Sequence, residues 1–128
     1  MRTPSRVEPL GPFERWRLES ELAVVELLPE RGALVTRFVA GTDELLFLDE
    51  ATVLDTARSV RGGIPILWPN AGALPSTPIE RDGVAVRLTR HGFARDRAWT
   101  VADSGCDERG AFIRLALEDD DASRAVFQ

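Results

Sequence analysis

The chain has 128 residues, enough to bury one modest hydrophobic core, and its 44% hydrophobic and 29% charged residues are typical of a globular protein. Its formal charge is −5, and all 16 of its basic residues are arginine. Because an acidic chain without basic clusters binds phosphate backbones poorly, we expect no nucleic-acid partner. The absence of lysine excludes Schiff-base chemistry and a P-loop lysine.

The first twelve residues contain two arginines but no apolar stretch as long as that of a signal peptide. No run approaches the roughly 20 apolar residues that cross a bilayer. We therefore expect a cytoplasmic protein without a membrane partner. Its one cysteine, Cys106, cannot form an internal disulfide and is expected in a turn as an incidental thiol.

Short apolar segments rich in β-branched and aromatic residues, separated by Gly, Pro and Asp, predict a mostly antiparallel β protein. The predicted strands are 13–19, 22–28, 33–40, 44–48, 78–80, 84–88, 97–103 and 111–118. Asp82-Gly83 is a favoured hairpin turn, and the last two strands pair around a turn at 104–110. One short helix is expected within 49–58, with Asp49 as its N-cap.

The end of the sequence predicts an acidic turn followed by part of a further strand. The acidic run 118–121 lacks the alternating spacing and the glycine of a calcium loop, so we expect a solvated hairpin tip and no metal site. Residues 123–128 are apolar again and predict a strand that is cut short. No repeat or linker divides the chain, and residues 1–128 are predicted to form a single domain.

Two segments depart from the pattern of strands and turns. Residues 60–72 contain paired glycines, which let the backbone approach a ligand or a neighbouring strand, and prolines that constrain the path of Arg61. Residues 90–96 contain His91, the only histidine, beside arginines that should lower its pKa. Taken alone, His91 is more often a structural residue, and Arg61 and Arg95 are more often surface or salt-bridging residues.

Together the two motifs resemble a known family. Arg61-Gly62-Gly63-Ile64-Pro65 with Trp68-Pro69, followed by His91-Gly92-Phe93-Ala94-Arg95-Asp96 and Trp99, is similar to the hexose-6-phosphate mutarotase branch of the aldose 1-epimerase superfamily. The resemblance implies an all-β, antiparallel sandwich of the galactose mutarotase-like type, of which this chain is an incomplete amino-terminal portion. It also implies an isomerase of carbohydrate metabolism that needs no cofactor.

The resemblance implies roles for three residues. His91 lines the sugar site as a catalytic residue, and Arg61 and Arg95 bind the substrate, an aldose or a hexose 6-phosphate. The second histidine and the glutamate that act as principal acid and base in the similar enzymes have no counterpart in these 128 residues. Asn70-Ala71-Gly72 departs from the phosphosugar branch, which often has an aromatic residue before the glycine, and this leaves an unphosphorylated aldose possible as the substrate.

Three interpretations follow from this incomplete set. The first is a mutarotase that is complete only with a longer chain or another subunit, and the second is a non-catalytic carbohydrate-binding or interaction module. The third is an incomplete copy without activity. Truncation of a large sandwich leaves strand edges and apolar surface exposed, so we also expect self-association.

Overall fold

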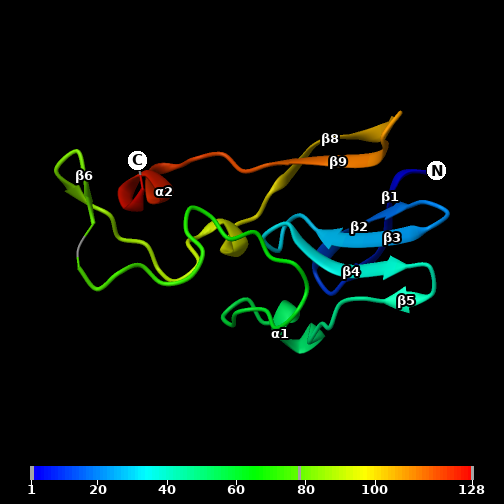
Figure 1. Cartoon of the computed structure of the whole chain (residues 1–128), viewed down its shortest axis with the longest axis horizontal. Helices are drawn as coiled ribbons and strands as arrows, with labels where there is room; N and C mark the ends of the chain where they lie inside the picture. Colours follow the sequence, from blue (N-terminus) through cyan, green and yellow to red (C-terminus); the bar gives the residue numbers. More distant parts are fainter. Residues whose placement is uncertain (1, 78, 128) are drawn as a thin grey trace.

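The computed structural model describes residues 2–77 and 79–127, in which most regular structure is antiparallel β. Five strands form one sheet in sequence order (Figure 1). They are β1 (Arg2–Leu10), β2 (Phe13–Glu19), β3 (Ala23–Leu28), β4 (Leu34–Ala40) and β5 (Asp43–Glu44). Each strand pairs with the next one in the chain, as expected when short turns join antiparallel neighbours.

Two hairpins complete the β structure. The first joins β6 (Glu80–Arg81) to β7 (Val84–Ala85) through the predicted Asp82-Gly83 turn, while Pro78 of the predicted strand lies outside the described residues. The second joins β8 (Thr100–Asp107) to β9 (Gly110–Ala116), and this hairpin packs on β1 and β2. In Figure 1 it lies above the five-stranded sheet.

Several sequence predictions about strands need correction. The strands predicted at 44–48 and 84–88 are only the short strands Asp43–Glu44 and Val84–Ala85. The polar segment that forms β1 was not predicted, because most of its side chains are exposed and only pairing with β2 makes it a strand. Its two prolines are tolerated because β1 is an edge strand of the sheet. The predicted turn at 104–110 is also too long, since β8 continues to Asp107 and places exposed Cys106 on a strand.

Both α-helices are short, and each begins with a side-chain N-cap. Helix α1 (Glu50–Leu54) begins as predicted at Asp49, whose carboxylate accepts a hydrogen bond from the Ala51 N–H. The predicted strand at 123–128 is wrong, because helix α2 (Asp121–Val126) occupies this part of the chain up to Val126. Asp120 and Ser123 form a capping box, in which each side chain accepts from the backbone N–H of the other.

A small core lies between the sheet and the segment that follows α1. Leu28, Leu34 and Val53 are almost fully buried, and partly buried Leu10, Phe13, Leu48 and Val60 pack against them. Arg31 is also buried, and its guanidinium donates hydrogen bonds to the backbone oxygens of Val53 and Arg58, both at 3.0 Å. Carbonyls at the end of a helix lack helical partners, so this arginine fastens α1 to the turn between β3 and β4.

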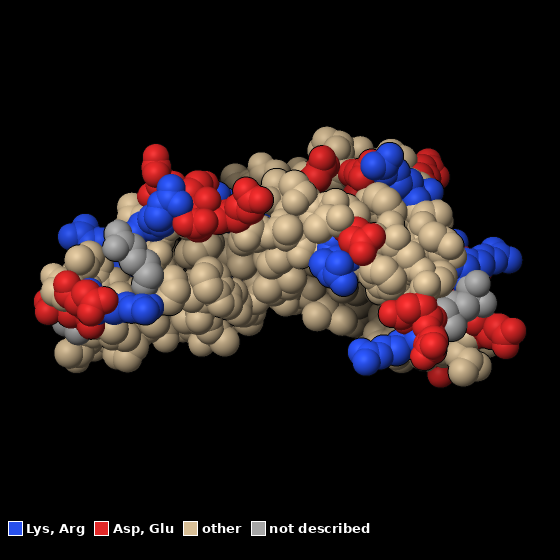
Figure 2. All heavy atoms as spheres, turned by 90° about the horizontal axis from the view of Figure 1, so that it is seen from above, with Lys and Arg blue, Asp and Glu red and all other residues tan. Residues whose placement is uncertain are grey.

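The surface carries both charged and large apolar side chains. Figure 2 shows acidic and basic residues intermixed toward both ends of one face, with an uncharged region between them. The large exposed hydrophobic residues are Leu22, Leu45, Phe47, Leu54, Ile64, Leu67, Trp68, Ile79 and Val84. Among the described residues, no helix has the length and hydropathy required to cross a membrane.

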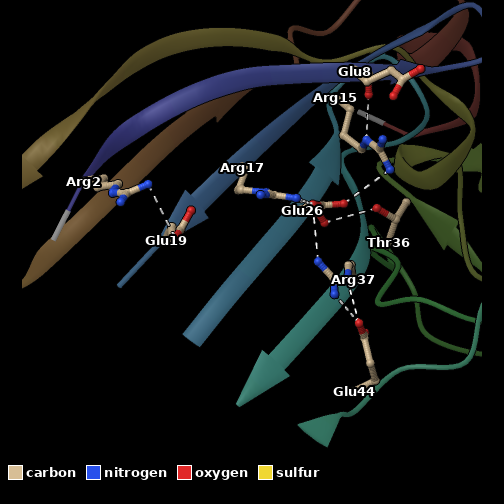
Figure 3. Close-up of polar contacts among 9 residues, drawn as sticks. All are labelled: Arg2, Glu8, Arg15, Arg17, Glu19, Glu26, Thr36, Arg37 and Glu44. Carbon is tan, nitrogen blue, oxygen red and sulfur yellow. Dashed lines mark hydrogen bonds and ion pairs between the residues drawn. The ribbon is translucent and has the colours of Figure 1, made fainter. Parts of the chain in front are cut away.

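One buried carboxylate organises the polar face of the sheet (Figure 3). Glu26 is only 2% exposed, and the antiparallel register places Arg17 of β2 and Arg37 of β4 directly opposite it. Its Oε1 accepts from the Arg17 Nε at 2.9 Å and its Oε2 from the Arg15 NH1 at 3.3 Å, while the Arg37 NH1 lies 3.7 Å from Oε1. The three guanidinium groups compensate the desolvation of this carboxylate.

We expect Glu26→Gln to lower the free energy of unfolding by about 3 kcal/mol, because it leaves three clustered arginines without their shared anion. Urea denaturation measures this loss. Glu44→Gln is the matched control, since Glu44 also pairs with Arg37 but is exposed, and it should cost less than about 1 kcal/mol. Equal losses in the two variants would contradict a structural role for the buried carboxylate.

Candidate functional site

The segment from Gly62 to Ile64 lies against the five-stranded sheet and the chain that follows it. Gly62 forms an antiparallel bridge with Leu48, and Ile64 forms one with Val35 of β4. A Cβ on Gly62 would lie 2.1 Å from the carbonyl oxygen of Phe47, so only glycine fits here. The sequence left open whether the paired glycines face a ligand or a strand, and the structure shows that Gly62 faces neighbouring backbone.

Arg61 is placed by its backbone. Its N–H donates to the Thr52 Oγ1 at 2.9 Å, and its carbonyl accepts from the Asp49 N–H at 2.9 Å, so the start of α1 holds the residue in position. The side chain is exposed and forms no hydrogen bond or ion pair within residues 2–77 and 79–127. The donors of its guanidinium are therefore open to a ligand.

A junction between Trp68 and Gly92 joins the two motifs. Their backbones form a parallel bridge, and the N–H groups of Phe93 and Ala94 both donate to the Trp68 carbonyl at 3.0 and 3.2 Å. A Cβ on Gly92 would meet that carbonyl oxygen at 2.2 Å, so the close approach requires glycine. The Trp68 ring packs edge-on against Phe93 and Phe127 with centroids 5.5 Å away, yet it stays 49% exposed.

His91 is held in an unusual backbone conformation beside this junction. Its φ is 68°, in the left-handed region that costs a non-glycine residue of order 1–3 kcal/mol. Two hydrogen bonds with Gly72 hold it there: the His91 N–H donates to the Gly72 carbonyl, and the Gly72 N–H donates to the His91 Nδ1, both at 2.8 Å. The position of the imidazole is therefore determined by its backbone and its ring together.

The hydrogen bond to Nδ1 determines where the neutral ring carries its proton. Because Nδ1 accepts from Gly72, the proton lies on Nε2, which becomes a donor. Arg90 Nε also donates toward Nε2, at 3.3 Å, and this contact competes with the tautomer; the 2.8 Å hydrogen bond from Gly72 is the shorter of the two and favours Nδ1 as the acceptor nitrogen. Burial, followed by the positive charges of Arg95 and Arg90, lowers the pKa of His91, so the ring is neutral at neutral pH.

The predicted direction of this pKa shift is confirmed, with one difference in its cause. The sequence indicated the neighbouring arginines, whereas burial makes the largest contribution. Burial could not be read from the sequence, because it comes from the packing of residues 68–72 against 89–94. A neutral imidazole with its proton on Nε2 can donate a hydrogen bond through that nitrogen.

Arg95 lies in the 3-10 helix η1 (Ala94–Asp96), close enough to His91 for its charge to act on the imidazole. Its NH2 donates weakly to the Arg90 carbonyl at 3.4 Å, while its Nε is buried without a hydrogen-bond partner and lies 4.0 Å from the Asp96 carboxylate. A cavity of about 30 Å³ adjoins it, lined in part by Gly62 and Pro65. That volume holds about one water and is too small for a hexose.

The structure therefore brings two of the three predicted site residues into one neighbourhood. His91 and Arg95 lie together beyond the junction, whereas Arg61 lies at the other end of the 61–69 segment and contacts neither of them. Sequence reasoning missed two residues that position His91: Gly72, which forms hydrogen bonds with its ring and its backbone, and Asn70, which donates to the Gly72 carbonyl. The signal was the unusual residue pair itself, since Asn70 and Ala71 replace the pattern expected before Gly72. Within the described residues, no cluster of side chains could hold a metal ion.

Comparison with known proteins finds relatives that share one name. A "putative glucose-6-phosphate 1-epimerase" of Salmonella typhimurium is 33% identical over 84 residues, which are 66% of this chain and 26% of that protein. A protein of the same name from Escherichia coli strain K12 is 33% identical over 78 residues, which are 61% of this chain and 24% of that protein. No protein-family model matches the chain.

Solved structures agree with these relatives. The Slr1438 protein of Synechocystis sp. PCC 6803 superposes with a TM-score of 0.81 and 37% identity over 95% of this chain and 41% of that one. A "putative mutarotase (YeaD)" of Salmonella typhimurium gives a TM-score of 0.68 and 27% identity over 95% of this chain and 38% of that one. These similarities are consistent with a partial hexose-6-phosphate mutarotase-like domain. The predicted all-β sandwich class is confirmed, and the chain spans less than half the length of the relatives it matches.

We expect Arg95→Gln to raise the pKa of His91 toward its ordinary value, because removal of a neighbouring cation makes the imidazolium less unfavourable. An NMR titration of the single histidine measures the pKa directly. Arg109→Gln, at the tip of the β8–β9 hairpin, is the control and should leave the titration unchanged. Identical titration curves for the Arg95 variant and the native chain would show that the two side chains do not interact.

Proposed function

We propose that this chain is part of a sugar mutarotase, an isomerase that interconverts the α and β anomers of an aldose or a hexose 6-phosphate. Residues 1–128 would form a single partial domain of that enzyme. The observation that supports the proposal most is the fixed, neutral imidazole of His91 beside Arg95, located in the motif that resembles this family. The names of the relatives favour the phosphorylated substrate.

Mutarotation needs a proton to leave the anomeric hydroxyl and a proton to reach the ring oxygen, after which the ring opens, rotates and closes again. Proton transfers of this kind contribute roughly 10²–10⁴-fold each to the rate. The Nε2–H of His91 is suited to donate a hydrogen bond to one of these two reacting oxygens as charge develops on it. The lowered pKa of His91 favours the neutral ring, which carries this donor, and the second proton transfer needs another group.

Arg61 and Arg95 supply the binding groups in this proposal. A guanidinium offers planar, paired donors that match a phosphate or a pair of sugar hydroxyls. Arg95 has a buried Nε without a partner, and Arg61 has an exposed side chain, so both have donors available. Since Arg95 lies near His91 and Arg61 lies apart from it, one of them is expected at the sugar ring and the other at the phosphate.

The test is anomer exchange of purified α-glucose and α-glucose 6-phosphate, followed by exchange NMR with the whole chain present. We expect faster exchange than the uncatalysed rate, and we expect His91→Ala to abolish the acceleration because the donor to the reacting oxygen is lost. Arg109→Ala is the control for folding and should keep it. Acceleration that survives His91→Ala would contradict the assigned role of the imidazole.

The same samples separate the second candidate function, a carbohydrate-binding module without turnover. The match to only part of each relative favours this candidate, since the family resemblance implies a principal acid and base that have no counterpart in these 128 residues. Its signature is a sugar-dependent shift of the His91 resonances without faster anomer exchange. If neither sugar shifts these resonances, both functions are excluded for this chain alone.

We also propose that the chain self-associates through its exposed apolar residues and strand edges. Phe47, Ile64 and Trp68 are 74%, 46% and 49% exposed, and apolar side chains this open to water favour association. Sedimentation velocity at micromolar concentration should show dimers or larger species, and Phe47→Ser should shift the distribution toward the monomer. One compact monomer for the native chain would exclude self-association.

A further inference from the structure

We propose that Asn70 is a positioning residue that keeps the His91 imidazole in the tautomer with its proton on Nε2. The inference deepens the proposed function, on which its catalytic meaning rests. Asn70 does not touch the imidazole; it acts through the backbone of Gly72. Asn70 is not one of the residues that carry the family resemblance.

The side-chain amide of Asn70 joins two backbone segments. Its Nδ2 donates to the Gly72 carbonyl at 2.8 Å and to the Thr89 carbonyl at 3.2 Å. These two acceptors also determine the orientation of the amide, because a flipped amide would place its oxygen against two carbonyl oxygens. The single amide group thus links residue 72 to residue 89 across seventeen positions of sequence.

Both carbonyls that Asn70 binds also hold the loop around His91. The Gly72 carbonyl accepts from the His91 N–H at 2.8 Å, and the Thr89 carbonyl accepts from the Gly92 N–H at 3.0 Å. With the Gly72 peptide held on its carbonyl side, the N–H of the same residue donates to the His91 Nδ1 at 2.8 Å. Asn70 therefore orients the donor that occupies Nδ1.

The cost of this arrangement supports a specific role for the amide. The Asn70 Oδ1 is buried and has no hydrogen-bond partner in the described residues. A buried acceptor without a partner destabilises the fold, and an apolar residue at this position would avoid that loss. The two hydrogen bonds donated by Nδ2 offset it, and their effect is concentrated on the loop that holds the imidazole.

The chemical consequence concerns which atom of His91 faces a substrate as a donor. With Nδ1 occupied by the Gly72 N–H, the ring presents Nε2–H. If the Gly72 peptide is free to turn, the neutral ring exchanges its proton between the two nitrogens, and part of the population presents an acceptor instead. A reacting sugar oxygen that gains negative charge needs the donor form.

The test uses the fact that the chain contains one histidine, so that ¹⁵N labelling of histidine gives one pair of imidazole nitrogens. Two-dimensional ¹H–¹⁵N spectra above the pKa report which nitrogen carries the proton. For the native chain we expect Nε2–H alone. For Asn70→Ala we expect a second tautomer to appear, with a pKa of His91 that rises toward its ordinary value because the neutral form has lost a hydrogen bond.

Ala71→Ser is the matched control, because this exposed residue lies between Asn70 and Gly72 and should leave the tautomer unchanged. Should Asn70→Ala not fold, Asn70→Asp keeps the volume of the side chain but lacks the two donors, and the second tautomer should appear again. A single Nε2–H tautomer in either folded Asn70 variant would overturn the proposal. So would a native chain in which Nδ1 carries the proton.

These spectra need no substrate, so they separate the inference from the proposed function. If the tautomer depends on Asn70 but the chain neither binds nor interconverts a sugar, the positioning role stands and the mutarotase proposal fails. If the native chain accelerates anomer exchange, we expect Asn70→Ala to lower kcat more than it changes KM, because the donor acts on the reacting oxygen. An unchanged kcat with a changed tautomer would overturn the catalytic meaning of Asn70.

Discussion

The candidate site depends on the junction at which the backbone of Trp68 lies beside that of Gly92. One carbonyl oxygen accepts two N–H groups there, and the missing side chain of Gly92 permits the close approach. Because the two segments are joined at this point, Gly72 comes next to His91, and Arg95 lies near the imidazole. Residues that are far apart in the sequence thereby form one polar neighbourhood.

Charge is arranged differently in the sheet and in this neighbourhood. In the sheet, the arginines around Glu26 share its carboxylate, and Arg37 also pairs with Glu44, so these cations are neutralised within the fold. Near His91, Arg95 forms only a long ion pair with Asp96 at 4.0 Å and keeps a buried Nε without a hydrogen-bond partner, and nothing in the described part of the chain pairs with the side chain of Arg61. These two guanidinium groups retain donors for a ligand, whereas those of the sheet are used for stability.

Much of the fold could be predicted because its signals are local. The bounds of β2 match the apolar segment predicted at 13–19. The Asp82-Gly83 hairpin follows from its turn residues, and the start of α1 follows from Asp49. The errors arose where a local signal was weak or was outweighed by another. The polar β1 is a strand only because β2 pairs with it, and the apolar end of the chain is helical because Asp120 and Ser123 cap it.

The sequence by itself determined the antiparallel β class, the resemblance to mutarotases and the prediction that arginines lower the pKa of His91, because each depends on residue types or on residues adjacent in the chain. Only the tertiary structure decided which nitrogen of His91 is occupied, since its partner Gly72 lies nineteen residues away. It also decided that Gly62 faces backbone and that Arg61 stands apart from His91. Such relations depend on how segments pack against one another, and no local pattern of residues encodes them.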